Sequence, residues 1–261
     1  MRFLRDVQQR FTRRGGRYLA AGLAFLAFTA LFPILLVATA VTGWLFSRDP
    51  GVVDGIIDTL GLGPDTSDFV TDLLEQGEAS ATAATIIGFV GMVWTGMGMA
   101  GAVAYLYDAA WGVPTRGLLG RLIGLLWLIG AGIFFIGSVF LTGFFINTPW
   151  LGNLLGFITP YVLFLWTSWI LPNRDIHWPS ALIGSAVGAI GFQVLALIGA
   201  IVLPQLLDSF SSLYGSLGVV FALLAWIYLL SRVVTYAAMI EGTAGKRALG
   251  EQTTEVFGLD F

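Results

Sequence analysis

The stretch YGSLGVVFALLAWIYLLSRVVTYAAMIEG, residues 214–242, decides the fold class of this 261-residue chain. From Leu217 to Ile240 it is almost entirely apolar, and it exceeds the roughly 20 residues that a helix needs to cross about 30 Å of hydrocarbon. The composition agrees, because 57% of the residues are hydrophobic and only 11% are charged, whereas soluble domains carry about 25% charged residues. The sequence therefore predicts an integral membrane protein.

Five further stretches of this kind precede the last one. The predicted spans are 19–46, 81–106, 118–145, 150–171, 177–203 and 216–240. Helices are expected because lipid offers no partner to a free backbone N–H or C=O group. We therefore predict an all-α polytopic membrane protein with six transmembrane helices. Pro33 and Pro160, in the first and fourth spans, raise the further idea of an inverted 3+3 arrangement of the two halves.

Basic residues are distributed unevenly between the two sides that six spans create. Twelve of the 13 lie in the N-terminal tail, the loops 105–121 and 172–178, and the C-terminal end from Arg232 onward, and the exception is Arg48. An excess of Lys and Arg marks cytoplasmic segments. We therefore expect an inner or plasma membrane protein with both termini in the cytoplasm. The first span is far longer than the about 7–15 apolar residues of a cleaved signal peptide.

Three segments flank or interrupt the predicted transmembrane domain 18–241. Residues 1–17 place apolar side chains at helical spacing among arginines, which predicts a basic amphipathic helix on the membrane surface, with lipids and not nucleic acid as its partner. Segment 47–80 carries eight carboxylates, and its pattern predicts two short amphipathic helices outside the membrane, broken at GLGPD, 61–65. It serves either as a lid or as a solvated connection. Residues 242–261 are expected to form a cytoplasmic tail.

Arg232 is the strongest candidate for a functional group in the membrane, because charged groups in hydrocarbon are costly. Tyr228 and Tyr236 lie four residues to either side of it, so the three share one helix face. That face suits either an aromatic belt at the membrane interface or a cavity that binds a phosphate or carboxylate. Gln193, in the fifth span, either bonds a neighbouring helix or contacts a substrate. Tyr214 is a further candidate lining residue.

Three residues are candidates for a hinge or a gate. Pro33 interrupts the backbone hydrogen bonding of its helix, and Asp108 and Arg116 are placed to pair across the loop 105–121. Neither a cofactor nor a metal is expected, because the chain has no cysteine, a single histidine (His177) and no recognisable pattern of metal ligands or nucleophiles. An enzyme is therefore not expected.

Four stretches together carry a resemblance to a known family. They are LAAGLAFLAFTALFPILLVATAV (19–41), YLYDAAWGVPTRGLLGRLIGLL (105–126), LPNRDIHWPSALIGSAVGAIGFQVL (171–195) and YGSLGVVFALLAWIYLLSRVV (214–234). In combination they resemble the YihY/BrkB family of bacterial and archaeal inner-membrane proteins, once labelled ribonuclease BN-like. The resemblance extends over nearly the whole chain and implies six transmembrane helices.

The chain departs from that family in two places. The family usually closes with Gly-Ala-Glu, whereas this chain has MIEG and leaves Glu241 after Ile240. Family members tend to have an uncharged residue near the position of Arg232, so the resemblance implies no role for this arginine. The ribonuclease label fits poorly, because RNA hydrolysis generally requires a metal cluster or an acid–base pair.

Three functional hypotheses follow, in this order. The first is a transporter or flippase-like exporter of a small organic or amphiphilic anion, with Arg232, Gln193 and the three tyrosines lining its path. The second is a non-transporting membrane scaffold or regulator, which needs no polar cavity in its bundle. The third and most remote is a membrane-associated ribonuclease.

Overall fold

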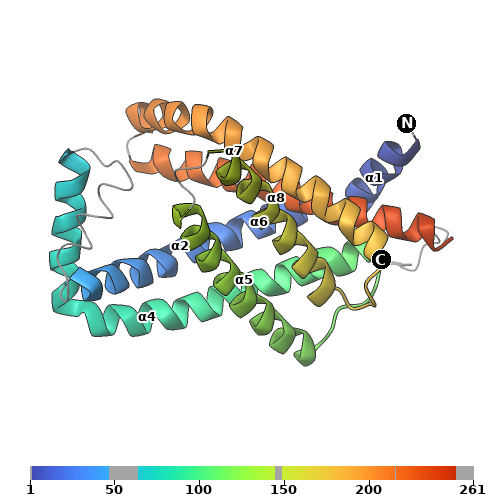
Figure 1. Ribbon diagram of the computed structural model, residues 1–261, viewed down its shortest axis with the longest axis horizontal. Helices are drawn as coiled ribbons and strands as arrows, with labels where there is room; N and C mark the ends of the chain where they lie inside the picture. The colour runs from blue at the N-terminus through green and yellow to red at the C-terminus, as the bar shows by residue number, and fades with distance from the viewer. Residues whose placement is uncertain (1, 47–63, 145–148, 215, 251–261) are drawn as a thin grey trace. The chain divides into compact units, whose positions relative to one another are not determined.

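The computed structural model describes residues 2–46, 64–144, 149–214 and 216–250. They form α1 (Arg2–Arg13), α2 (Gly16–Phe46), α4 (Pro64–Trp111), α5 (Leu118–Phe144), α6 (Pro149–Ile170), α7 (Trp178–Tyr214) and α8 (Ser216–Ala248), and these described residues contain no strand (Figure 1). The predicted all-α class is confirmed.

Four helical stretches are long and apolar enough to cross a membrane. They are Gly16–Leu36, Gly88–Trp111, Trp178–Leu203 and Leu217–Ala248, and Leu122–Phe134 and Leu154–Ile170 are shorter apolar helices. The six predicted spans overlap α2 and α4 to α8, and within the described residues four of these helices contain a stretch that is long and apolar enough to cross a membrane. The protein is an integral membrane protein with several apolar helices.

Helix α4 corrects the prediction of two short helices in segment 47–80. Residues 47–63 lie outside the described part, but Pro64 begins a single helix that runs without a break to Trp111. Proline is well placed in a first helical turn, where its missing N–H is not needed. Pro64 and Asp65 of the GLGPD motif thus begin α4, and the first of the two predicted helices lies outside the described residues.

The chain divides into two compact units. One comprises Met1–Leu26 and Met97–Phe261, and the other comprises Ala27–Gly96. In the second unit a side chain added at Gly91 would lie 3.2 Å from Pro33 Cβ, so α4 passes close to α2 at the proline predicted as a hinge. The residues described below all belong to the first unit.

Helices α7 and α8 pack antiparallel through a series of glycines on α7 (Figure 1). A Cβ atom at Gly191 would lie 2.8 Å from Val233, and one at Gly199 would lie 2.4 Å from Trp226. Small residues let helix backbones approach closely in membranes. The glycines of the predicted fifth span therefore serve helix packing.

Helix α1 runs antiparallel along the C-terminal half of α8. Phe3 lies under Arg247 near the end of α8, whereas Phe11 stacks on Tyr236 with ring centroids 4.4 Å apart. The chain then turns at Gly15, whose φ of 64° favours glycine. Val7 and Phe11 are buried in the protein core. The placement of α1 on the membrane surface stays a prediction.

The end of α4 packs on α8 at a position that admits only glycine. An added Cβ at Gly242 would lie 2.3 Å from the carbonyl oxygen of Ala110. Overpacking of this kind typically costs about 1–3 kcal/mol. We predict that Gly242→Ala lowers the free energy of unfolding by about that amount, measured by thermal denaturation in detergent.

The matched control is Gly132→Ala, because an added Cβ at Gly132 of α5 meets nothing within 4 Å. This variant should be neutral or slightly stabilising, since alanine is the better helix former. Equal stability of the two variants would contradict the packing of α4 on α8.

Candidate functional site

Four segments that are distant in sequence meet at one end of the first unit, which we call the basic end. They are α1, the loop 112–117, the turn 171–177 and the part of α8 after Glu241. Arg10 contacts Ala110 and Gly242, Arg116 bonds Pro172, and Arg174 lies 4.2 Å above the Trp111 ring. The segments that carry most of the basic residues therefore come together in space.

Glu241 is a buried acidic group of the basic end, with 1% of its surface exposed. Its Oε1 accepts a hydrogen bond from the indole N–H of Trp111 on α4 at 3.2 Å, and its Oε2 lies 2.6 Å from the hydroxyl of Ser168 on α6. On the side of α7, an added Cβ at Gly184 would lie 2.7 Å from Glu241 Cβ. The carboxyl group thus lies among α4, α6 and α7.

Arg10 connects α1 to the end of α4 and to α8 beside Glu241. Its guanidinium donates to the carbonyl oxygen of Ala110 at 2.6 Å and to that of Gly242 at 3.4 Å, and the side chain is 8% exposed. Ala110 is in the last turn of α4, where carbonyl groups lack partners within the helix. Burial lowers the pKa of Arg10, Arg14 lowers it further, and Asp6 opposes the change. Arginine stays charged, so the basic end holds a buried cation near Glu241.

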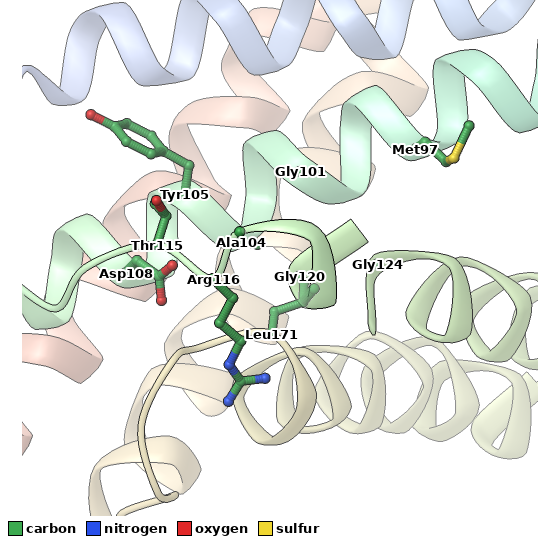
Figure 2. Close-up of a pocket in the computed structure, with 11 residues that line it drawn as sticks. Met97, Gly101, Ala104, Tyr105, Asp108, Thr115, Arg116, Gly120, Gly124 and Leu171 are labelled. Carbon is green, nitrogen blue, oxygen red and sulfur yellow. The ribbon is translucent and has the colours of Figure 1, made fainter. Parts of the chain in front are cut away.

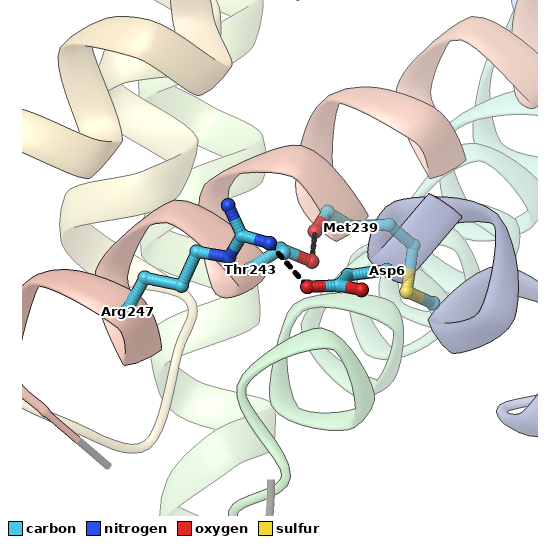
Figure 3. A network of polar contacts seen from close by, with 4 residues as sticks. All are labelled: Asp6, Met239, Thr243 and Arg247. Carbon is cyan, nitrogen blue, oxygen red and sulfur yellow. Dashed lines mark hydrogen bonds and ion pairs between the residues drawn. The ribbon is translucent and has the colours of Figure 1, made fainter. Parts of the chain in front are cut away.

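The contact between α1 and α8 is completed by an ion pair between the middle of α1 and the end of α8. Asp6 pairs with Arg247, and one turn before Arg247 the hydroxyl of Thr243 donates to the carbonyl of Met239 (Figure 3). Both partners of the ion pair are about half exposed. Exposed pairs of this kind contribute about 0–1 kcal/mol, so the buried apolar side chains of α1 contribute more to this contact.

A cavity of about 440 Å³ opens beside α4 at the basic end. Its apolar wall includes Met97, Ala104 and Leu171, and its polar groups come from Tyr105, Asp108, Thr115 and Arg116 (Figure 2). Gly101, Gly117, Gly120 and Gly124 complete the lining. The cavity combines an apolar surface with charges of both signs, as a site for an amphiphilic molecule requires.

Asp108 and Arg116, the predicted gate pair, are joined through a third residue. Asp108 Oδ1 accepts the backbone N–H of Asn173 at 2.7 Å, and Arg116 Nε donates to Asn173 Oδ1 at 3.0 Å. Arg116 also donates to the carbonyls of Ile170 and Pro172, and Figure 2 shows its guanidinium directed away from Asp108. Within the described residues the two charges form no direct ion pair, and the turn at Asn173 connects them.

Arg232 and Tyr236 lie together, as their spacing predicts, but they face α1. The Arg232 guanidinium is 5.9 Å from the centroid of the Phe11 ring, and one of its nitrogens lies 3.4 Å from the Tyr236 hydroxyl. That hydroxyl donates to Gln8 at 3.2 Å. In the described part of the chain no carboxylate pairs with Arg232, and this arginine is not among the residues that line the cavity.

The other predicted lining residues are not gathered with Arg232. Gln193 lies on α7 against α6, since an added Cβ at Gly156 would be 3.2 Å from its Oε1. This contact accords with the role of a helix-packing residue. Tyr228 is half-buried on α8. The side chain of Tyr214 lies outside the described residues.

No functional role for Glu241, Ser168 or Asn173 was predicted from the sequence, although Glu241 stands where the chain departs from the closing motif of the family that it resembles. Glu241 follows a long apolar run, which is where a charged residue ordinarily meets water. Ser168 is one of several buried hydroxyls that bond the carbonyl four residues earlier, as do Thr235 and Thr243. Such bonds hide polar groups within a helix. The one sequence feature that could have indicated the burial of Glu241 is the pair Gly242 and Gly245 that follows it. These glycines allow another helix to pack over the carboxylate.

No group of three or more His, Asp or Glu side chains that could hold a metal ion occurs among the described residues. His177 lies at the start of α7, where its ring contacts the Ser180 hydroxyl at 3.0 Å and its carbonyl oxygen accepts the same hydroxyl. These contacts give His177 a role in beginning α7.

Comparison with known proteins identifies several relatives. The family model described as Virulence factor BrkB matches residues 7–255. A UPF0761 membrane protein of Azoarcus sp. (strain BH72) is 26% identical over 259 residues, which cover 92% of this chain and 63% of that protein. The inner membrane protein YhjD of Escherichia coli (strain K12) is 23% identical over 267 residues, with coverages of 90% and 79%.

A UPF0761 membrane protein of Coxiella burnetii (strain RSA 493 / Nine Mile phase I) is 27% identical over 259 residues, and the match covers 90% of each chain. The chain thus spans less than two thirds of the Azoarcus relative and most of the other two. No solved structure matches this chain.

The hydrogen bonds of Glu241 lead to a prediction about two substitutions. Glu241→Ala leaves the buried indole N–H of Trp111 without its partner, which costs about 1–3 kcal/mol, whereas the Ser168 hydroxyl keeps its bond to the Phe164 carbonyl. Glu241→Gln retains an oxygen for Trp111 and an N–H group for Ser168. We expect the alanine variant to melt well below the wild type and the glutamine variant to melt close to it. Equal losses in the two variants would contradict this assignment of the contacts.

Proposed function

Because this chain belongs to the YihY/BrkB family of membrane proteins, we propose that it is a six-span transporter. It would act as a flippase-like exporter of a small organic or amphiphilic anion. The cavity at the basic end carries this proposal. A scaffold packed solid has no need of a cavity with an apolar wall and charged groups at one end.

The proposed topology places both termini in the cytoplasm. Its support is the meeting of α1, the loop 112–117, the turn 171–177 and the end of α8 at the basic end. Six spans bring these four segments to one side of the membrane, and their excess of Lys and Arg assigns that side to the cytoplasm. The cavity then opens toward the cytoplasm, where an exporter takes up its substrate.

Arg116 is the proposed partner of the anionic group. Its side chain has five N–H donors, and three hydrogen bonds join it to Asn173, Ile170 and Pro172. An alkyl chain attached to the anion would lie along Met97, Ala104 and Leu171. The cavity therefore fits an amphiphile with its charged group toward the loop 112–117.

Binding at Arg116 also suggests how the site is gated. Arg116 and Asp108 both hold the turn at Asn173. An anion that competes for the Arg116 guanidinium weakens its bonds to Asn173, Ile170 and Pro172, and so loosens the turn that leads into α7. Asp108 and Arg116 would thus form the latch expected from the sequence, with Asn173 as its third member.

Arg232 remains a second proposed contact for the anion, at the α1–α8 interface. Its guanidinium has no carboxylate partner in the described residues, and two aromatic rings flank it. Tyr236 would assist it there, and Gln193, Tyr214, Tyr228 and the hinge Pro33 would belong to the path beyond. The two arginines make different predictions about substitutions, so they can be separated by experiment.

We predict that octyl phosphate raises the melting temperature of the purified protein in nanodiscs, whereas uncharged octanol does not. A ligand at about 100 times its Kd stabilises the folded state by about 2.7 kcal/mol. Arg116→Gln should abolish the increase. Arg17→Gln, which removes an exposed arginine at the start of α2, should keep it and is the matched control.

Arg232→Gln separates the two contacts. Loss of the increase in this variant alone would place the anion between α1 and α8. Retention of the full increase in both Arg116→Gln and Arg232→Gln would contradict the proposed site.

A further inference from the structure

Glu241 is a buried ionisable group that has no role in the proposed binding cavity. It does not line the cavity, and the described residues offer it no ion pair with Lys, Arg or His. Its two hydrogen-bond partners, Trp111 and Ser168, are neutral. Removing an ionised carboxylate from water costs several kcal/mol or more unless a charge or a hydrogen-bond network compensates. Such a group in a membrane protein calls for an explanation of its protonation.

The hydroxyl of Ser168 supplies the decisive geometry. Its oxygen lies 2.6 Å from Glu241 Oε2 and 2.9 Å from the carbonyl oxygen of Phe164. A serine hydroxyl has one hydrogen to donate and two lone pairs to accept. It therefore cannot donate to both oxygens at once. If Glu241 carries a proton, the carboxyl group donates to Ser168 and Ser168 donates to Phe164, so all three atoms are satisfied.

The same three atoms also accommodate the ionised carboxylate. When the proton leaves Oε2, the Ser168 hydroxyl turns to donate to Oε2, and the carbonyl of Phe164 keeps its place in the helical hydrogen bonding of α6. Trp111 donates to Oε1 in either state. The site thus needs only the rotation of one hydroxyl group to exchange between its two protonation states.

From this geometry we propose that Glu241 is a proton-exchange site, with Ser168 as the hydroxyl that rotates between its two states. In the uptake step a hydronium ion at the basic end transfers a proton to Oε2, leaves water, and converts the carboxylate into a neutral carboxyl group. Release is the reverse step, and it returns the proton to water.

A metal cation does not fit this site as well as a proton does. The side of Oε1 is occupied by the Trp111 N–H, which donates and has no lone pair for a cation. On the side of α7, Gly184 leaves no room for even a methyl group. Calcium and magnesium need several oxygen ligands, and among the described residues the Ser168 hydroxyl is the one side-chain oxygen that bonds the carboxyl group.

Several elements packed around Glu241 carry charged or titratable groups. Arg10 of α1 bonds the carbonyl of the next residue, Gly242. Tyr107 of α4 interacts electrostatically with the carboxyl group and forms a hydrogen bond with Ser168. Arg174, in the turn 171–177, covers Trp111, and Ser168 is the partner from α6. On α8 itself Lys246 lies beyond Gly245, and α7 contributes Gly184 and Ser180 with His177 before them. Arg14 and Lys246 lie at Gly112, where an added Cβ would be 3.0 Å from a side-chain nitrogen of each. Arg10 and Arg174 are the cations that contact Gly242 and Trp111.

These two cations connect the proton site to the cavity. Arg10 holds the carbonyl of Ala110, and Arg174 lies on Trp111. The next residues, 112–117, form the loop that ends with the cavity residues Thr115, Arg116 and Gly117. Ionisation of Glu241 attracts both cations and displaces the end of α4. Export coupled to proton exchange follows from this link, and that part rests on the proposed function.

Infrared difference spectroscopy of the full chain in nanodiscs tests the proton site directly, because a protonated carboxyl group has a C=O band that a carboxylate lacks. The wild type should have a band of a buried carboxyl group that disappears as the pH is raised. Glu241→Gln should lack this band, and Asp108→Asn, which alters the other buried acid of the basic end, should retain it. Identical carboxyl bands in the wild type and in folded Glu241→Gln at every pH would overturn the proposal.

The coupling is tested separately by the binding of octyl phosphate as a function of pH. Exchange of one proton changes the affinity by up to about tenfold per pH unit, so the wild type should show pH dependence beyond that of the phosphate itself. Glu241→Gln should show a weaker pH dependence, limited to that of the phosphate and of Asp108 in the cavity wall. Equal pH profiles in the two proteins would overturn the coupling. Absence of octyl phosphate binding would count against the proposed function, while the infrared result would still decide the proton site.

Discussion

A carboxyl group buried in an apolar bundle has to be satisfied by the neighbouring helices, and the basic end is built on this constraint at Glu241. Trp111 must come from α4 and Ser168 from α6, so both helices end beside α8. Glycine is needed wherever another backbone crosses the group, as at Gly184 and Gly242. One acidic side chain thus fixes the relative positions of four helix segments.

The cavity depends on the same arrangement. Trp111 is the last residue of α4, and Gly112 ends the helix with a φ of 69°, which glycine adopts without strain. The loop that follows brings Arg116 to Asn173, close to the cation–π contact between Arg174 and Trp111. The wall of the cavity and the environment of Glu241 therefore share one short piece of chain. A change of charge at one site has a direct structural route to the other.

The sequence predicted the helical class and the apolar stretches, because both follow from composition and run length alone. It also indicated that Asp108 and Arg116 lie near each other, at the loop 105–121. It could not reveal that Asn173 joins them, since this contact depends on how the α6–α7 turn folds back. Burial of Val7 and Phe11 was missed for a related reason. An apolar helix face looks the same in a sequence whether lipid or protein covers it.

For Arg232, the sequence indicated which residues share its helix face but not which helix packs on that face. Its spacing from Tyr236 was correctly read as one helix face, yet the partner of that face is α1, which precedes it by more than 200 residues in the chain. Glu241 was overlooked because a charge after a long apolar run is ordinarily a sign that the membrane ends. In both cases the deciding information is a long-range contact.

In the proposed transporter, the cavity receives an anionic amphiphile from the cytoplasmic side. The chain has no cysteine, so a single Ala104→Cys substitution in the cavity wall can be followed with a membrane-impermeant maleimide in oriented vesicles. Asp54→Cys, in the segment predicted outside, reports the opposite face. The account predicts that Cys at position 104 reacts only when the cytoplasmic face is accessible and that octyl phosphate slows the reaction. Reaction from the outer face, or a rate unaffected by octyl phosphate, would contradict it.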